Sequence, residues 1–261
     1  ETFSYKKVSG SSVALRVLYV DEIFIIENDV NLLNSVKAYL NGKFSMKDLG
    51  EASYILGIKI YRDRPKRLIA LCQSTYLEKI LMRFSMDQAK KGFLPVVKGS
   101  GALSLTQCPV TAHDNEKMSH VPYSLAIGSI MYAMLSTQPD VALALSLTSR
   151  FQSNPGMHHW TAVKNILKYL KRTKDMSLVY GGREEELAVT GYTDASFDTD
   201  PDDSKSQSGY VFLVNGGAVS WRSGKQDTVA QSIMESEYIA SSDAANAADW
   251  LRNFILGRGW V

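Results

Sequence analysis

The chain has 261 residues, with 29 basic and 27 acidic side chains and a net charge of +2, so it can hold two compact units and has no bulk charge that would by itself attract nucleic acid. No apolar run approaches the ~18 residues of a membrane span, and Cys72 and Cys108 lack the paired spacing of a zinc site or a disulfide framework. These features predict an intracellular protein, cytoplasmic or nuclear, with no membrane partner, and the missing initiator Met suggests a piece of something longer.

The first predicted element is a hairpin. Two apolar, β-branched runs, Leu15–Val20 and Ile23–Ile26, flank the acidic pair Asp21-Glu22, which is typical of two strands joined by a tight turn. Asn28 or Asp29 can then cap a helix whose apolar residues recur at helical spacing as far as Asn41-Gly42.

The next elements are strands and one helix. Tyr54–Ile60 reads as a strand, Arg62–Lys66 as a polar turn, Leu68–Cys72 as a second strand and Thr75–Phe84 as a helix. Residues 97–120 are polar with little periodicity, which predicts a long connection.

Helical patterns resume after this connection. Small and apolar residues fill Pro122–Leu147, where Pro139 should end one helix and open the next. A further helix over His158–Lys171 has one apolar side, and its other side carries Lys164, Lys168, Lys171 and Arg172. Such a basic face is either a solvated surface or a nucleic-acid-binding surface.

The last section predicts a three-stranded antiparallel sheet and a helix. Strands are expected at Leu187–Thr193, followed by Asp194, at Gly209–Val214, and at Ala218–Trp221 after the hairpin signal Asn215-Gly216. A helix rich in Ala and Ser should run over residues 231–256 and carry Glu235 and Glu237. We expect the open edge after the third strand to limit stability.

Two sets of acids could serve phosphoryl transfer, which needs carboxylates that converge on metal ions from rigid elements. Asp21 and Glu22 lie at a hairpin tip, and Asp194 on a strand could meet Glu237 on a helix at one magnesium ion. Asp21 and Glu22 could instead form an ordinary solvated turn. Asp194 and Glu237 could be a chance pair of acids.

Longer motifs carry a family resemblance. The sequence Tyr19-Val20-Asp21-Glu22 resembles the Tyr-Val-Asp-Asp turn of reverse transcriptases, and Phe44–Glu51 followed by Leu56-Gly57-Ile58 resembles the segment after it in copia-type retrotransposon Pol polyproteins. Further segments are similar to the connecting region of those polyproteins: Tyr123, Ile127–Tyr132, Gln138–Asp140, Asn154-Pro155, His159-Trp160 and Lys168–Lys171. Others are similar to the opening of their RNase H domain: Gly191–Ala195, Ser206, Ser208–Tyr210, Ser220-Trp221, Ser223, Gln226 and Glu235–Ala240.

The resemblance implies an α+β fold with three parts. These are antiparallel palm-type hairpins in residues 1–96, a linker with a helical thumb and connection in residues 97–180, and a truncated RNase H-like sheet and helix in residues 181–261. It also implies an RNA–DNA hybrid or other nucleic acid as partner, facing the basic helix, and the remainder of a polyprotein; a homo-oligomer is a further possibility.

The resemblance also assigns catalytic roles. Asp21 takes a metal-binding position of the polymerase, and Glu22 replaces the second Asp of the turn. Asp194 and Glu237 take the first two carboxylates of RNase H, and Glu235 is a neighbouring acid that is not a ligand. The implied cofactor is magnesium or manganese. The remaining carboxylates of both sites would lie before Glu1 and after Val261, so we expect weak or no activity from this chain.

Two other functions stay open at this stage. The chain could be a non-catalytic module, domesticated to bind nucleic acid or protein through its basic helix. It could also serve unrelated chemistry, but it offers no distinctive nucleophile, and we interpret its histidines as structural or incidental: His113, His120, His158 and His159.

Overall fold

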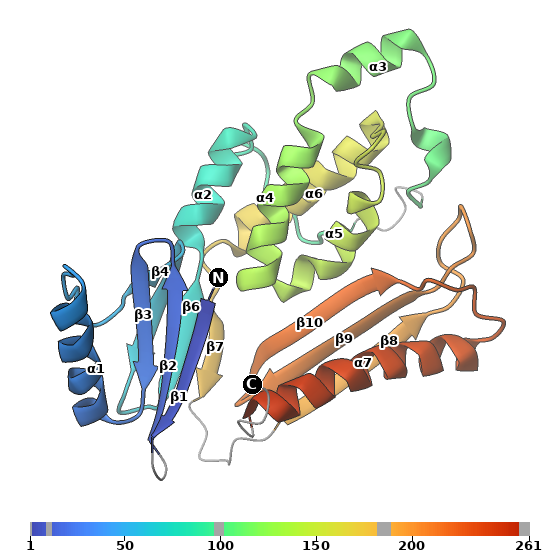
Figure 1. The fold of residues 1–261 in the computed structure, drawn as a ribbon. Coiled ribbons are helices and arrows are strands. Elements are labelled where there is room, and N and C mark those ends of the chain that lie inside the picture. The colour runs from blue at the N-terminus through green and yellow to red at the C-terminus, as the bar shows by residue number, and fades with distance from the viewer. Residues whose placement is uncertain (1, 9–11, 97–101, 182–188, 256–261) are drawn as a thin grey trace.

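The computed structural model describes residues 2–8, 12–96, 102–181 and 189–255. These residues combine three antiparallel sheets with a group of packed helices. Figure 1 shows the N-terminal sheet and the C-terminal sheet on different sides of the molecule, with the packed helices above them. Among the described residues, no helix is both long and apolar enough to cross a membrane.

The N-terminal sheet has the order β1-β2-β3 and is followed by one helix. Asp29 begins that helix, as the sequence predicted for this position or its neighbour, because its Oδ1 accepts a hydrogen bond of 2.9 Å from the Asn31 N–H. The elements are β1 (Thr2–Val8), β2 (Ser12–Tyr19), β3 (Glu22–Glu27) and α1 (Val30–Lys43).

A four-stranded sheet follows, and its last strand comes from a distant part of the chain. The single strand expected over Tyr54–Ile60 is wrong: Leu56 and Gly57 have φ values of 51° and 76° and form a tight turn between two strands. The closing strand pairs with β6 in antiparallel register. The elements are β4 (Tyr54–Ile55), β5 (Ile58–Asp63), β6 (Leu68–Cys72) and β7 (Leu178–Gly181).

The largest hydrophobic core lies among the helices. It joins Leu77 and Ile80 of α2 to Ile127 of α4 and Leu167 of α6, all at most 1% exposed. Residues on both sides of the predicted boundary between residues 96 and 97 therefore share one core. We refer to these helices as the helical unit: α2 (Ser74–Arg83), α4 (Tyr123–Ser136), η2 (Pro139–Val141), α5 (Ala142–Ser149) and α6 (Met157–Thr173).

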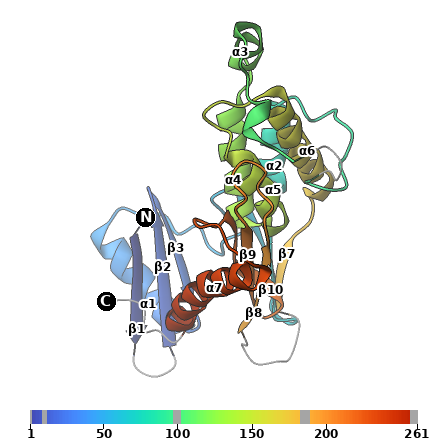
Figure 2. The ribbon, with the colours of Figure 1, turned by 90° about the vertical axis from the view of Figure 1, so that its right-hand side faces the viewer.

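The expected long connection contains helical turns that the sequence analysis missed. The short η1 (Leu105–Gln107) and α3 (Ala112–Ser119) both lie in it. The side chain of Thr111 caps α3, and Met118 is its one buried residue, so the helix lacks the apolar stripe that would reveal it. Figure 2 shows α3 at one end of the molecule, beyond the helical unit.

The C-terminal sheet has the order β10-β9-β8 and packs against one long helix. The predicted Asn215-Gly216 turn is confirmed, since both residues have positive φ values, 53° and 81°. The predicted strand start at Leu187 and helix end at Leu256 lie outside the described residues. The elements are β8 (Val189–Ser196), β9 (Gln207–Val214), β10 (Gly217–Lys225) and α7 (Ile233–Ile255).

The two edges of this sheet differ. β10, where we expected the exposed edge, packs against α5 and β7. In the described part of the chain, β8 has β9 on one side and no strand on its other side, and seven of its eight residues are exposed. The open edge is therefore at the first strand of the sheet, because the helical unit and β7 shield the third.

Candidate active sites

The acidic turn joins β2 to β3. Tyr19 pairs with Glu22, which leaves Val20 and Asp21 as a two-residue loop. Val20 has a φ of 52°, a conformation that a β-branched residue rarely adopts and that stores strain. Both acids are exposed, so the hairpin presents the Asp21 carboxylate at its tip, and Glu22 is already the first residue of β3.

Carboxylate oxygens are the ligands that magnesium prefers, so the acids of the turn have suitable chemistry. However, the described residues contain no group of three or more His, Cys, Asp or Glu side chains that could hold a metal ion. The described acids therefore do not by themselves complete a magnesium site, either at this turn or in the C-terminal sheet.

Asp194 lies in β8 opposite Gly209 of β9. Its neighbour Thr193 points toward α7, because the Thr193 hydroxyl donates a 3.2 Å hydrogen bond to the Ala240 carbonyl. Successive side chains of a strand point to opposite faces. The exposed Asp194 side chain therefore leaves the sheet on the face away from α7.

Glu237 lies near the start of α7 and is half-buried. The helix buries Ser236, Ala240 and Ala244 against the sheet, and helical geometry puts Glu237 and Asp243 on opposite flanks of that stripe. Asp243 lines a small cavity with residues of β9 and β10, so Glu237 lies on the flank toward β8.

The two predicted RNase H acids thus lie on opposite faces of the sheet: Asp194 points away from α7, and Glu237 is on α7 itself. A cation shared by Asp194 and Glu237 would have to lie at the outer edge of β8. Glu235 has another contact, since its Oε2 accepts a 2.7 Å hydrogen bond from the Gln231 N–H before α7 begins. The shared site of Asp194 and Glu237 stays a prediction.

The basic side of α6 is partly covered by the segment Asp87–Phe93. The Lys171 ammonium group donates to the Asp87 carbonyl and, at 2.7 Å, to the Ala89 carbonyl. The Arg172 guanidinium lies 4.0 Å from the centre of the Phe93 ring. Both cations therefore already have partners within the chain.

The same segment also contacts α6 one turn earlier. The Gly92 N–H donates a 2.9 Å hydrogen bond to the Lys168 carbonyl, and a Cβ at Gly92 would lie 3.0 Å from the Lys168 Cβ. Lys164 and Lys168 are half-buried, and no ion pair is found for either among the described residues. Of the four predicted cations, these two are the better candidates for nucleic-acid contact.

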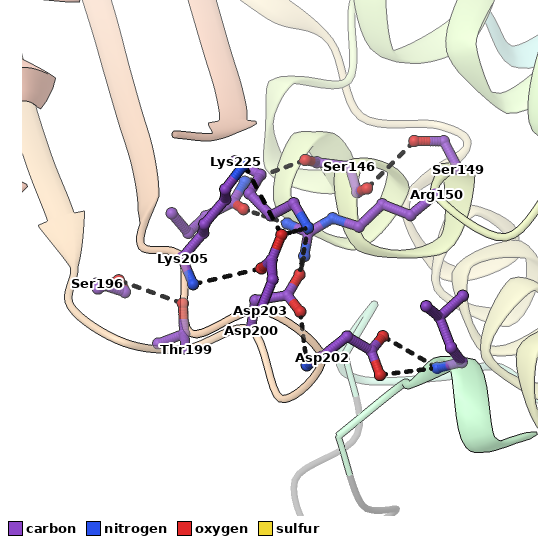
Figure 3. A network of polar contacts seen from close by, with 12 residues as sticks. Ser146, Ser149, Arg150, Ser196, Thr199, Asp200, Asp202, Asp203, Lys205 and Lys225 are labelled. Atoms are coloured by element: carbon purple, nitrogen blue, oxygen red, sulfur yellow. Dashed lines mark hydrogen bonds and ion pairs between the residues drawn. The ribbon is translucent and has the colours of Figure 1, made fainter. Parts of the chain in front are cut away.

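A polar cluster that the sequence did not indicate surrounds Asp200 (Figure 3). The acidic stretch at residues 198–203 predicts only a loop. Asp200 is buried and is paired with Arg150 and Lys225 from distant parts of the chain. No local pattern distinguishes a buried Asp from its exposed neighbours, so the sequence offered no signal for this cluster.

Residues 2–98 match the family described as reverse transcriptase (RNA-dependent DNA polymerase). The chain is 44% identical over 251 residues, 96% of its length, to the retrovirus-related Pol polyprotein from transposon TNT 1-94 of Nicotiana tabacum, of which it covers 19%. It is 30% identical over 96% of its length to the one from transposon RE2 of Arabidopsis thaliana, of which it covers 16%.

A shorter relative matches about half of the chain. The secreted RxLR effector protein 161 of Plasmopara viticola is 46% identical over 134 residues, which are 51% of this chain and 94% of that protein. No solved structure matches. The chain therefore spans less than a fifth of the two Pol polyproteins, with 19% and 16% of their lengths, but nearly all of the shorter relative.

Proposed function

The chain belongs to the copia-type retrotransposon Pol polyproteins and carries part of their reverse transcriptase, and from this premise we propose that it contributes to both catalytic activities of such a polyprotein. One is nucleotidyl transfer by the RNA-directed DNA polymerase, and the other is hydrolysis of the RNA strand by ribonuclease H. The observation that carries the proposal is Asp21, exposed at the tip of a strained hairpin within the segment that matches the reverse transcriptase family.

For the polymerase, Asp21 is the proposed metal-binding carboxylate. A tight loop between two paired strands fixes its backbone, which favours a defined carboxylate position. Glu22 is one methylene longer than the aspartate of the resembled turn. A displacement of about 1 Å at a catalytic group can cost ~100-fold in rate, so we propose that Glu22 lowers the polymerase rate.

For ribonuclease H, the support is the antiparallel order β10-β9-β8 followed by α7. We propose that Asp194 and Glu237 supply oxygen ligands to magnesium or manganese at the outer edge of β8. When bound, such an ion polarises the phosphate and the attacking water. Because no three acids come together among the described residues, further carboxylates are needed, and the chain alone is weakly active or inactive.

The proposed partners are an RNA–DNA hybrid or another nucleic acid, and the rest of the polyprotein. The two Pol polyproteins are more than five times as long as the matched segment, which is 19% of one and 16% of the other. A second function, non-catalytic binding of nucleic acid, is favoured by the half-buried cations Lys164 and Lys168 on α6.

Two assays of the chain with magnesium test the proposal. Primer extension and cleavage of an RNA–DNA hybrid should both remain below detection, whereas binding of the same hybrid should be measurable and should weaken with salt. Robust turnover that Asp21→Ala or Asp194→Ala abolishes would contradict inactivity of the isolated chain. Absence of hybrid binding at low salt would contradict the proposed substrate.

A further inference from the structure

The loop between β8 and β9 is attached to the helical unit through a buried acid. Asp200 in this loop has a side chain that is only 5% exposed. Its carboxylate accepts a hydrogen bond from Arg150, which follows α5 in the helical unit, and pairs with the Lys225 ammonium at 3.0 Å. Figure 3 shows the loop, α5 and the end of β10 converging on this carboxylate.

The charges in this cluster are compensated. The Asp202 N–H donates a 2.9 Å hydrogen bond to Asp200, and Lys225 also pairs with Asp203 at 2.8 Å. Burial alone would raise the pKa of Asp200, but the hydrogen bonds from Lys225 and Asp202, together with the charges of Lys225 and Arg150, hold it below its usual range. Asp200 is therefore an ionised acid in a largely buried setting.

A second set of contacts extends the attachment. Gln207 at the start of β9 accepts a hydrogen bond from Arg150 and donates to the Ser146 hydroxyl of α5 at 3.0 Å and to the Ser223 hydroxyl of β10 at 2.8 Å. Next to Asp200, the Asp202 carboxylate accepts the Leu105 N–H at 2.9 and 3.0 Å. The polar contacts thus reach two elements outside the C-terminal sheet, η1 and α5, together with Arg150 immediately after α5.

We propose that Asp200 and Arg150 form a latch that fixes the C-terminal sheet against the helical unit in one orientation. An apolar contact alone is non-directional, whereas a buried ion pair tolerates few geometries, since leaving either charge without its partner is strongly unfavourable. A pair this buried is also poorly screened by salt. The latch makes Asp200 a positioning residue, which sets where β8 and α7 lie relative to the reverse transcriptase segment.

Trp221 contacts the helical unit at another point of the interface between this unit and the C-terminal sheet. Its indole N–H donates a 3.1 Å hydrogen bond to the Met134 carbonyl of α4, so it bridges the sheet and the helical unit without touching the latch. If the latch opens, this indole N–H should become accessible to solvent and exchange faster. The hydrogen bonds within the β8–β9 ladder should not change.

Hydrogen exchange measured by NMR on the full chain tests the latch. In Asp200→Asn, the Trp221 indole and the Leu105 amide should exchange more than about tenfold faster, because one charge of a buried pair is left alone. The β8–β9 amides should keep their rates. The matched control is Asp198→Asn, an exposed acid of the same loop, which should leave both sets of rates unchanged.

Two results would overturn the latch. One is an Asp200→Asn variant whose interface exchanges no faster than in Asp198→Asn. The other is faster exchange throughout β8 and β9, which would mean that Asp200 stabilises the sheet itself. Should Asp200→Asn fail to fold, Arg150→Gln and Arg150→Lys replace it in the same experiment. If the latch exists, the Trp221 indole and the Leu105 amide exchange faster in the Gln variant than in the Lys variant. Equal exchange rates in the two variants would overturn it.

Discussion

His159 connects α6 to the segments before η1 and between α5 and α6, and its replacement has a calculable effect. The ring is fully buried, with 0% exposure, and stacks on Phe151 at a centroid distance of 3.9 Å. Its Nδ1 accepts a 2.8 Å hydrogen bond from the Gly156 N–H, so its Nε2 carries the proton that faces the Ser104 carbonyl at 3.1 Å. The contact with Gly156 requires the neutral ring, because a protonated Nδ1 cannot accept a hydrogen bond.

The pH dependence follows from that requirement. Burial lowers the pKa of His159; the Ser104 carbonyl and Asp202 oppose this effect, and the nearby His158 adds to it. The folded protein therefore binds the proton less readily than the unfolded chain does. The stability contributed by His159 is complete above the unfolded pKa of ~6.5 and is lost as the pH falls from there toward the lower folded value.

The variant His159→Leu tests this reasoning. It leaves the Gly156 N–H and the Ser104 carbonyl without partners, at about 1–3 kcal/mol each, so we expect a loss of roughly 2–6 kcal/mol in the free energy of unfolding at pH 7.5. Urea unfolding at pH 7.5 and 5.5 should show a smaller pH effect in His159→Leu than in the parent chain.

The control for this experiment is His113→Gln, which changes an exposed histidine of α3. It should keep both the parent stability and the parent pH dependence. A His159→Leu variant that loses stability between pH 7.5 and 5.5 as steeply as the parent chain would refute the argument, because the proton uptake would then belong to another group.

Three other predictions concern the acidic turn, the core and the basic helix. Val20→Asn should raise the free energy of unfolding by about 0.5–1 kcal/mol, because Asn tolerates a positive φ and the 83% exposed Val20 loses little packing; a lower melting temperature would contradict this. Ile127→Ala, at a position with 0% exposure in the helical core, should cost about 2–5 kcal/mol in thermal or urea unfolding, and a cost below about 1 kcal/mol would mean that the core refills the space. Lys168→Glu should weaken hybrid binding and reduce the slope of log binding constant against log salt concentration by about one. Lys171→Met should mainly lower stability, because the Lys171 ammonium group already binds two carbonyls. Equal losses of hybrid affinity in the two variants would contradict the preference for Lys168 as the nucleic-acid contact.

Local signals allowed the best sequence predictions. The helix start could be predicted to within one residue, Asn28 or Asp29, because a short polar side chain before an apolar periodic run satisfies free N–H groups, and the cap is Asp29. Asn215-Gly216 could be identified as a hairpin turn because both residues tolerate the left-handed conformation. The acidic turn was found in the same way, from two apolar runs around Asp21 and Glu22.

Features that depend on distant residues could not be predicted. The pairing of β7 with β6 joins segments about one hundred residues apart, and neither strand encodes its partner. The coverage of Lys171 by the Asp87 and Ala89 carbonyls converts a surface cation into a structural one. The burial of Asp200 depends on Arg150 and Lys225 arriving from other elements, so its acidic neighbours gave no indication of it.

The role of Asp21 is tested most directly by cDNA synthesis in a complete polyprotein. The Nicotiana tabacum relative would carry this chain in place of its 251 matching residues, either unchanged or with Asp21→Asn, and with the exposed Asp175→Asn as the control. We expect cDNA from the unchanged chain and from the Asp175 variant, and none from the Asp21 variant. Equal cDNA yields with and without the Asp21 carboxylate would contradict its assignment to the polymerase site.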